Sequence, residues 1–155
     1  MPSDPIRLQV IDRIVEVLNG IQEGDTYFHS PRHVAKGFIA EPQGYPIYMV
    51  RSESGGDIEM HGDAQFAETF YVTINGRMQE IGDVVSPMER CLRDVRKAID
   101  TDFRSGAAAG SLVTLATLVT FDAPPDISYD VDSNGPFAEF SQRVRITIFG
   151  EFGEL

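Results

Sequence analysis

SPMERCLRDVRKAIDTDF, residues 86–103, is the stretch that decides the fold, because its start and its apolar face are both recognisable. Ser86 can cap a first turn, and Pro87 suits the first helical position, where no amide hydrogen bond is lost. Charged residues, Asp94 among them, fill one side. Apolar residues recur at steps of three and four on the other: Met88, Cys91, Leu92, Val95, Ala98, Ile99 and Phe103. The pattern predicts a helix of roughly 27 Å, long enough to lie across a small sheet.

Other elements follow from periodicity and turn chemistry. A second amphipathic helix is predicted over residues 5–19, ended by Gly20. Asn75-Gly76 resembles a tight hairpin turn. Segments rich in glycine, serine and acids predict a mobile loop or hairpin tip at 53–63 and a second loop at 130–136. Alternation or β-branched content predicts strands at residues 32–39, 47–52, 65–75, 112–121 and 140–148. The fourth of these, 112–121, is expected to be a central strand.

These elements predict the fold class. We expect a single α+β domain over residues 1–155, with one mostly antiparallel or mixed sheet of about five strands and two helices packed on one face. The opposite face, including Tyr71, Arg143 and Arg145, would meet water or another subunit. The last strand, which carries both arginines, would invite pairing with a second chain if it lay at a sheet edge, and an interior position is the alternative.

The composition excludes several classes of partner. The 13 Lys and Arg residues against 24 Asp and Glu residues give a formal net charge of -11, which argues against nucleic acid or anionic membrane as the main partner. No run approaches the ~18 apolar residues of a membrane span, and the N-terminus lacks the order of a signal peptide, so a soluble, unexported protein is expected. The single cysteine, Cys91, excludes an intrachain disulfide and is predicted to be a small buried hydrophobic residue.

One segment imitates a calcium-binding loop. DVDSNG at residues 130–135 places Asp130, Asp132, Asn134 and Gly135 where the start of such a loop has them. The twelfth position, which supplies a bidentate glutamate in a calcium loop, is Ser141, and a strand pattern follows in place of a helix. An Asp/Asn-rich turn is therefore the preferred interpretation.

Other candidate ligands are sparse. Glu59, His61 and Asp63 would point the same way on an extended chain and could hold a divalent ion. His29 and His33 have helical ligand spacing, but a proline between them spoils a regular turn. No nucleophile elbow, zinc-protease motif or dinucleotide fingerprint occurs, so neither an enzyme nor a cofactor is predicted. The acidic segments are interpreted as partner-contact loops, with candidate residues Glu53, Asp57, Glu59, Asp63, Asp130 and Asp132.

The whole layout resembles that of the tail terminator, or tail completion, proteins of long-tailed bacteriophages. The resemblance is carried by IRLQVIDRIVEVLNGI, YPIYMV, ETFYVTING, MERCLRDVRKAI and QRVRITIFGEF. It implies a subunit of a hexameric ring that caps the tail tube, ends tube polymerisation and offers a docking face to the neck or head-completion protein. It also implies a place in the virion tail, and in the host cytoplasm during assembly. DNA would pass through the lumen without sequence-specific binding, which acidic lumen residues would favour.

Two alternatives stay open at this point. One is another head-tail connector or neck completion protein. The second is a small cytosolic binding domain or metal-assisted enzyme that uses Glu59, His61 and Asp63. A strict monomer that gains thermal stability with a divalent ion would favour the second class.

Overall fold

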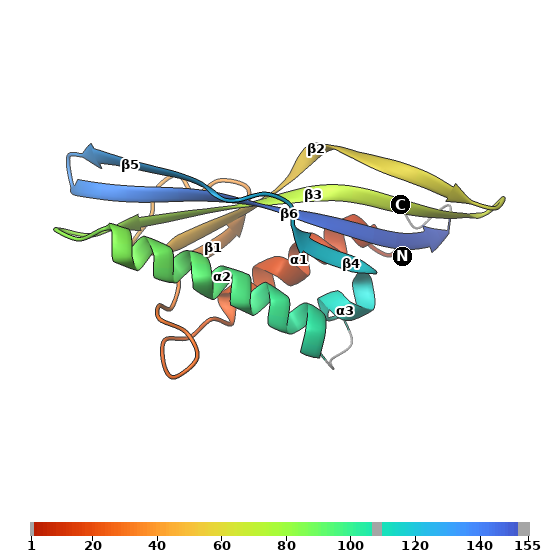
Figure 1. The fold of residues 1–155 in the computed structure, drawn as a ribbon, viewed down its shortest axis with the longest axis horizontal. Helices are drawn as coiled ribbons and strands as arrows, with labels where there is room; N and C mark the ends of the chain where they lie inside the picture. The colour runs from red at the N-terminus through yellow and green to blue at the C-terminus, as the bar shows by residue number, and fades with distance from the viewer. Residues whose placement is uncertain (1, 107–109, 152–155) are drawn as a thin grey trace.

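The computed structural model describes residues 2–106 and 110–151, which form one mixed six-stranded sheet with three helices on one face (Figure 1). The helices are α1 (Ile6–Asn19), α2 (Val85–Ser105) and α3 (Leu112–Leu115). The strands are β1 (His33–Lys36), β2 (Ile47–His61), β3 (Gln65–Gln79), β4 (Leu118–Phe121), β5 (Asp126–Asp132) and β6 (Gly135–Glu151). The predicted α+β class with two long helices on one sheet face is confirmed, and the described strands number six instead of about five.

β3 and β6 form the spine of the sheet. They pair antiparallel from Gln65 opposite Glu151 to Gln79 opposite Phe137. The strand order is β1-β2-β3-β6-β4, with β5 also paired to β6; β1 and β2 run parallel, and the other named strand pairs of the described residues are antiparallel. The last strand is therefore an interior strand, which decides between the two alternatives that its sequence left open.

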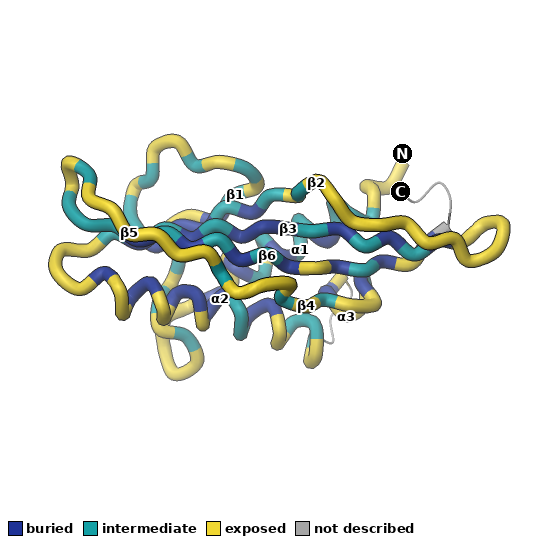
Figure 2. The backbone as a smooth tube through the Cα atoms, turned by 45° about the horizontal axis from the view of Figure 1, so that its top comes forward, coloured by how far each residue is buried: buried dark blue, intermediate teal, exposed yellow. Residues whose placement is uncertain are grey.

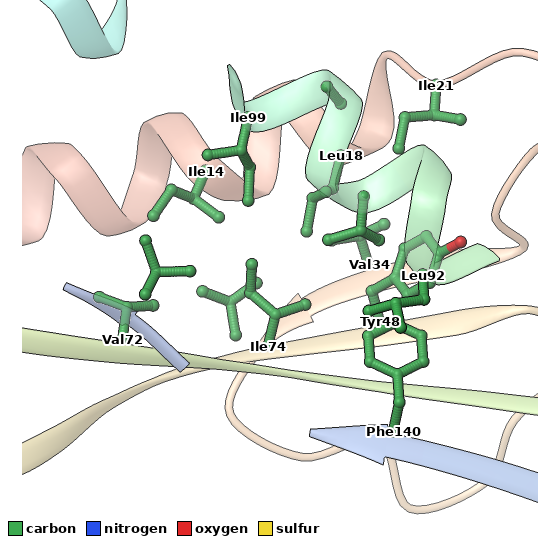
Figure 3. Close-up of a cluster of buried hydrophobic side chains, with 14 of the residues drawn as sticks. Ile14, Leu18, Ile21, Val34, Tyr48, Val72, Ile74, Leu92, Ile99 and Phe140 are labelled. Carbon is green, nitrogen blue, oxygen red and sulfur yellow. The ribbon is translucent and has the colours of Figure 1, made fainter. Parts of the chain in front are cut away.

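Apolar side chains from α1, α2 and the sheet form one core between the helices and the sheet (Figure 3). The predicted apolar face of α2 is confirmed, with Phe103 only partly buried and Cys91 a free, buried thiol. Helices and strands meet because the helical period of three to four and the strand period of two present their apolar sides to the same layer. Figure 3 labels the residues Ile14, Leu18, Ile21, Val34, Tyr48, Val72, Ile74, Leu92, Ile99 and Phe140.

The predicted cap of α2 is wrong. Asp83, not Ser86, satisfies the first amides, because its Oδ1 accepts hydrogen bonds from the N–H groups of Val85 at 3.0 Å and Ser86 at 3.1 Å. The helix begins at Val85 and ends at Ser105. An aspartate two or three residues before those amides reaches them as well as a serine would.

Asp94 is the second exception on α2, since the sequence pattern put it on the charged side. It is 0 % exposed, and its Oδ2 accepts the N–H groups of Phe28 at 2.9 Å and His29 at 3.0 Å. Arg93 lies 3.2 Å from the other oxygen and also donates to the carbonyl of Thr26. A buried carboxylate thus fastens the connection after α1 to the middle of α2, a long-range contact that helical periodicity does not show.

The predicted central strand at 112–121 is also wrong. Residues 112–115 form α3, and the strand that follows, β4, lies at the edge of the sheet beside residues 144–147 of β6. The N–H of Leu112 donates to Asp102 Oδ2 at 2.8 Å, and the Ser111 carbonyl accepts from the next turn. These tertiary contacts close a helical turn although Val, Leu and Thr favour a strand.

Two predicted loop segments belong to β-hairpins, and for 53–63 the hairpin-tip alternative is confirmed. β2 has a bulge between Glu53 and Asp57 but continues to His61, so that residues 62–64 form the turn. Gly55 and Gly56 allow the bulge because their φ angles are 102° and 101°, in the region open to glycine. Likewise β5 and β6 replace most of the loop at 130–136, joined by residues 133–134. The predicted strand at 32–39 is shorter, as β1.

Asn75 and Gly76 are not a turn but part of β3. A Cβ at Gly76 would collide with the ring of Phe140, which lies on it from β6. Glycine is therefore present for close cross-strand packing rather than for a left-handed turn. None of the helices in the described ranges is long and apolar enough to cross a bilayer.

Candidate assembly surface

The sheet face opposite the helices is open along β2, β3 and β6, as Figure 2 shows from its upper side. Alternate residues of β3 are buried toward the helices, and most of the residues between them are half-buried on this open face, where Thr73 is buried. The face is polar, because the strands present Arg, Glu, Thr and Tyr side chains there. A sheet with one dry and one polar face is typical of an antiparallel sheet that meets solvent or a partner on its second side.

Arg143 is at the centre of the open face. Its guanidinium lies 3.6 Å from the ring centroid of Tyr71. It also lies 3.4 Å from a carboxylate oxygen of Asp122, and its Nε lies 3.7 Å from Glu53. One cation therefore joins β2, β3, β6 and the segment after β4, so side-chain contacts link these strands across the open face.

A shallow hollow of about 270 Å³ lies next to this cluster. The hydroxyls of Thr69 and Thr147 are 3.0 Å apart across the strands. Arg145 is exposed and forms no ion pair with another of the residues that the structure describes. Acids and one unpaired cation therefore line the hollow, whose residues are Gly56, Asp57, Glu59, Ala67, Thr69, Tyr71, Arg145 and Thr147.

The structure brings together most of the sequence-predicted contact residues. Glu53, Asp57 and Glu59 lie on the same open face as Arg143 and Arg145, because β2 continues beside β3. Asp63 lies in the β2–β3 turn, and Asp130 and Asp132 belong to β5. Their contact with a partner stays a prediction.

Asp132 has a structural role. Its oxygens accept from Gln79 at 2.7 Å, from the N–H of Asn134 at 2.7 Å, and from Arg77 at 3.2 Å. The Asn134 amide, with Gln79 and Arg77, holds the pKa of Asp132 below its usual value of 3.8. The preferred interpretation of DVDSNG as an Asp/Asn-rich turn is confirmed, since these oxygens close a hairpin.

Glu59, His61 and Asp63 do not form a metal centre. The ring of His61 lies against that of Phe149, with centroids 5.6 Å apart. Within residues 2–106 and 110–151, no three His, Cys, Asp or Glu side chains are grouped so that they could hold a metal ion. The geometry therefore gives no support to the metal-assisted alternative.

Sequence reasoning missed a second surface, a groove of about 500 Å³ along α2. The guanidinium of Arg96 lies 5.7 Å from the ring centroid of Phe121 and donates twice to Gln142 Oε1, at 2.7 and 3.0 Å. The groove could not be found from the helix alone, because β4 supplies one wall. Its only signal was the density of cations on α2. The lining residues are Glu89, Leu92, Arg93, Arg96, Lys97, Asp100 and Phe121.

Comparison of the sequence with protein-family models and with curated proteins found no match.

Proposed function

We propose that this chain is a structural virion protein of the phage tail terminator type. As a ring-forming subunit, it caps the tail tube, ends tube polymerisation and provides the docking face for the neck or head-completion protein. The resemblance described above motivates this assignment. The α+β architecture, with helices on one side of a single sheet and a polar second side, is compatible with it.

The observation that carries the proposal is the length of the sheet. The paired 15 residues of β3 span about 50 Å, whereas the 21 residues of α2 span about 32 Å. The β2–β3 hairpin consequently extends well beyond the helices (Figure 1). A projecting arm of this kind adds little to the stability of a monomer and is suited to contact with another subunit.

Exposed apolar residues on the β2–β3 hairpin and on β5 support assembly. Ile58 and Met60 on β2 are 54 % and 52 % exposed, and Val131 on β5 is 69 % exposed. Ile58 and Met60 lie opposite the buried residues Glu68 and Phe66, so they point to the helix side of the sheet, yet about half of each side chain stays exposed. Such residues favour burial against a partner.

The proposed ring also gives the net charge of -11 a role. Acidic groups that line a lumen would repel the phosphates of DNA and let the genome pass without sticking. A ring whose lumen has positive potential would contradict this part of the proposal.

The experiment that tests the function is tube growth. The tail-tube protein from the same genome is polymerised with and without this chain, and the products are measured by negative-stain electron microscopy and sedimentation. We expect a ring of six copies at one tube end and shorter tubes as the ratio of chain to tube protein rises. Tubes of unchanged length with no terminal density would overturn the proposal.

A further inference from the structure

The cations of this acidic protein are concentrated on α2. Five of the 13 Lys and Arg residues of the chain lie on this helix. Arg93 and Arg96 already have partners within the subunit, whereas Lys97 forms no ion pair with another described residue. The groove that they line also holds two acids, Glu89 and Asp100, so its three cations leave it a small positive balance, and its apolar side is formed by Phe121 and the largely buried Leu92. We call it the basic groove; it suits a segment that combines negative charge with apolar side chains.

The β2–β3 arm has that composition. Residues 52–65 contain four acids and neither Lys nor Arg. Ile58 and Met60 are exposed on its helix-side face, and Asp63 lies in the turn. We call residues 57–65 the acidic tip.

Groove and tip belong to different parts of the subunit. Figure 1 shows the tip at one end of the sheet, beyond the helices, and α2 beneath the sheet toward the other end. Their contact therefore requires a second copy. An interface between two different surfaces of identical subunits is head-to-tail, and repeating it closes a ring when the rotation permits.

We propose that the acidic tip of one copy docks in the basic groove of the next copy. Ile58 and Met60 of the tip then cover Phe121, and Asp63 in the turn approaches Lys97, whereas Asp57 and Glu59 point to the other face of the hairpin. The proposal rests on the ring-forming function proposed above, to which it adds the interface. The open sheet face stays uncovered by this contact and remains free for the tube or the neck.

Cross-linking tests the contact directly. Met60→Cys and Lys97→Cys are made in separate chains and mixed, with a short bismaleimide as the probe. Only an intermolecular contact can join the two variants, and Cys91 stays silent because it is buried. We expect a cross-linked dimer from the mixture. The matched control replaces Lys97→Cys by Glu41→Cys, at an exposed position between β1 and β2, and should give no dimer.

Charge reversal tests the complementarity. Lys97→Glu and Asp63→Lys should each weaken self-association roughly tenfold, and the two chains mixed together should regain it, since the pair is then reversed. Glu41→Lys makes the same charge change at an exposed position between β1 and β2 and should leave association unaltered. Sedimentation velocity at low and high salt measures the effect, which salt should reduce.

The outcomes separate the interface from the function. If rings form on the tube without the cross-link and tolerate both charge reversals, the tip-in-groove contact is wrong. The proposed terminator function then still stands. A cross-link within a closed dimer, with each tip in the groove of the other copy, supports the contact and contradicts the ring. No association with or without the tube overturns both.

Discussion

Arg13 of α1 and Asp102 of α2 form a two-pronged ion pair, with Nη2 to Oδ1 at 2.6 Å and Nε to Oδ2 at 3.1 Å. Asp102 Oδ2 also accepts the N–H of Leu112 at 2.8 Å. One carboxylate therefore connects the two long helices and starts α3. Because all three helices meet the sheet on the same face, this contact fixes the layer beneath the open surface.

The first prediction concerns acid stability. Burial opposes ionisation of Asp102, but the hydrogen bonds from Arg13 and from the Leu112 amide outweigh it and hold the pKa of Asp102 below 3.8. A carboxyl whose pKa is lower in the folded state stabilises the fold fully above about 3.8 and loses this contribution as the pH falls through the folded value.

We therefore expect the free energy of unfolding to fall more steeply below pH 3.8 in the unchanged protein than in Asp102→Asn. Urea denaturation between about pH 2 and 6, followed by circular dichroism, measures the difference. Two parallel pH profiles would show that Asp102 titrates in the same way in the folded and unfolded chain.

The second prediction concerns Asp94. Asp94→Ala should destabilise the protein by about 3 kcal/mol, because the amides of Phe28 and His29 and the Arg93 cation lose their buried acceptor. Hydrogen exchange at those two amides should rise. The control is Asp100→Ala on the same helix, where an exposed ion pair with Arg104 is lost, and it should cost far less than the change at Asp94. Equal effects of the two changes would refute the role of Asp94.

The third prediction concerns Gly76. Gly76→Ala should cost about 1–3 kcal/mol, because the new methyl group would collide with the Phe140 ring and force it from its place in the core. Gly24→Ala is the matched control, since nothing lies within 4 Å of the Cβ it would add. Thermal or urea unfolding compares the two. A Gly76→Ala variant as stable as its control would mean that the ring moves freely.

Sequence reasoning succeeded where one local period decides the structure. The apolar face of α2 and the alternation around Val72 and Ile74 were predicted because each burial pattern repeats along its own element. It failed where a distant group decides. α3 replaces a strand because Asp102 supplies an acceptor, and β2 continues past Glu53 because two glycines absorb a bulge. Of the candidate site, the acids and arginines were found, but the groove was not, because its Phe121 wall comes from β4.

The last prediction concerns alkaline stability and the buried thiol. Burial raises the pKa of Cys91 from 9.0 to about 12. Above pH 9.0 the unfolded thiol loses its proton while the folded thiol keeps it, so the unfolded state binds fewer protons and stability falls as the pH rises. Cys91→Ala should therefore flatten this decline, although it lowers stability at neutral pH by leaving a small cavity.

Urea denaturation between about pH 8 and 11, with a phosphine reductant present, measures the slope. Tyr48 leaves a residual decline in Cys91→Ala, because burial also raises the pKa of its phenol well above 10.0. In the native unchanged protein, thiol labelling at pH 8 should be slow and should accelerate with urea, since the thiolate forms only when the core opens. Rapid labelling without urea, or the same alkaline slope in both proteins, would show that the thiol is not sealed between α2 and the sheet.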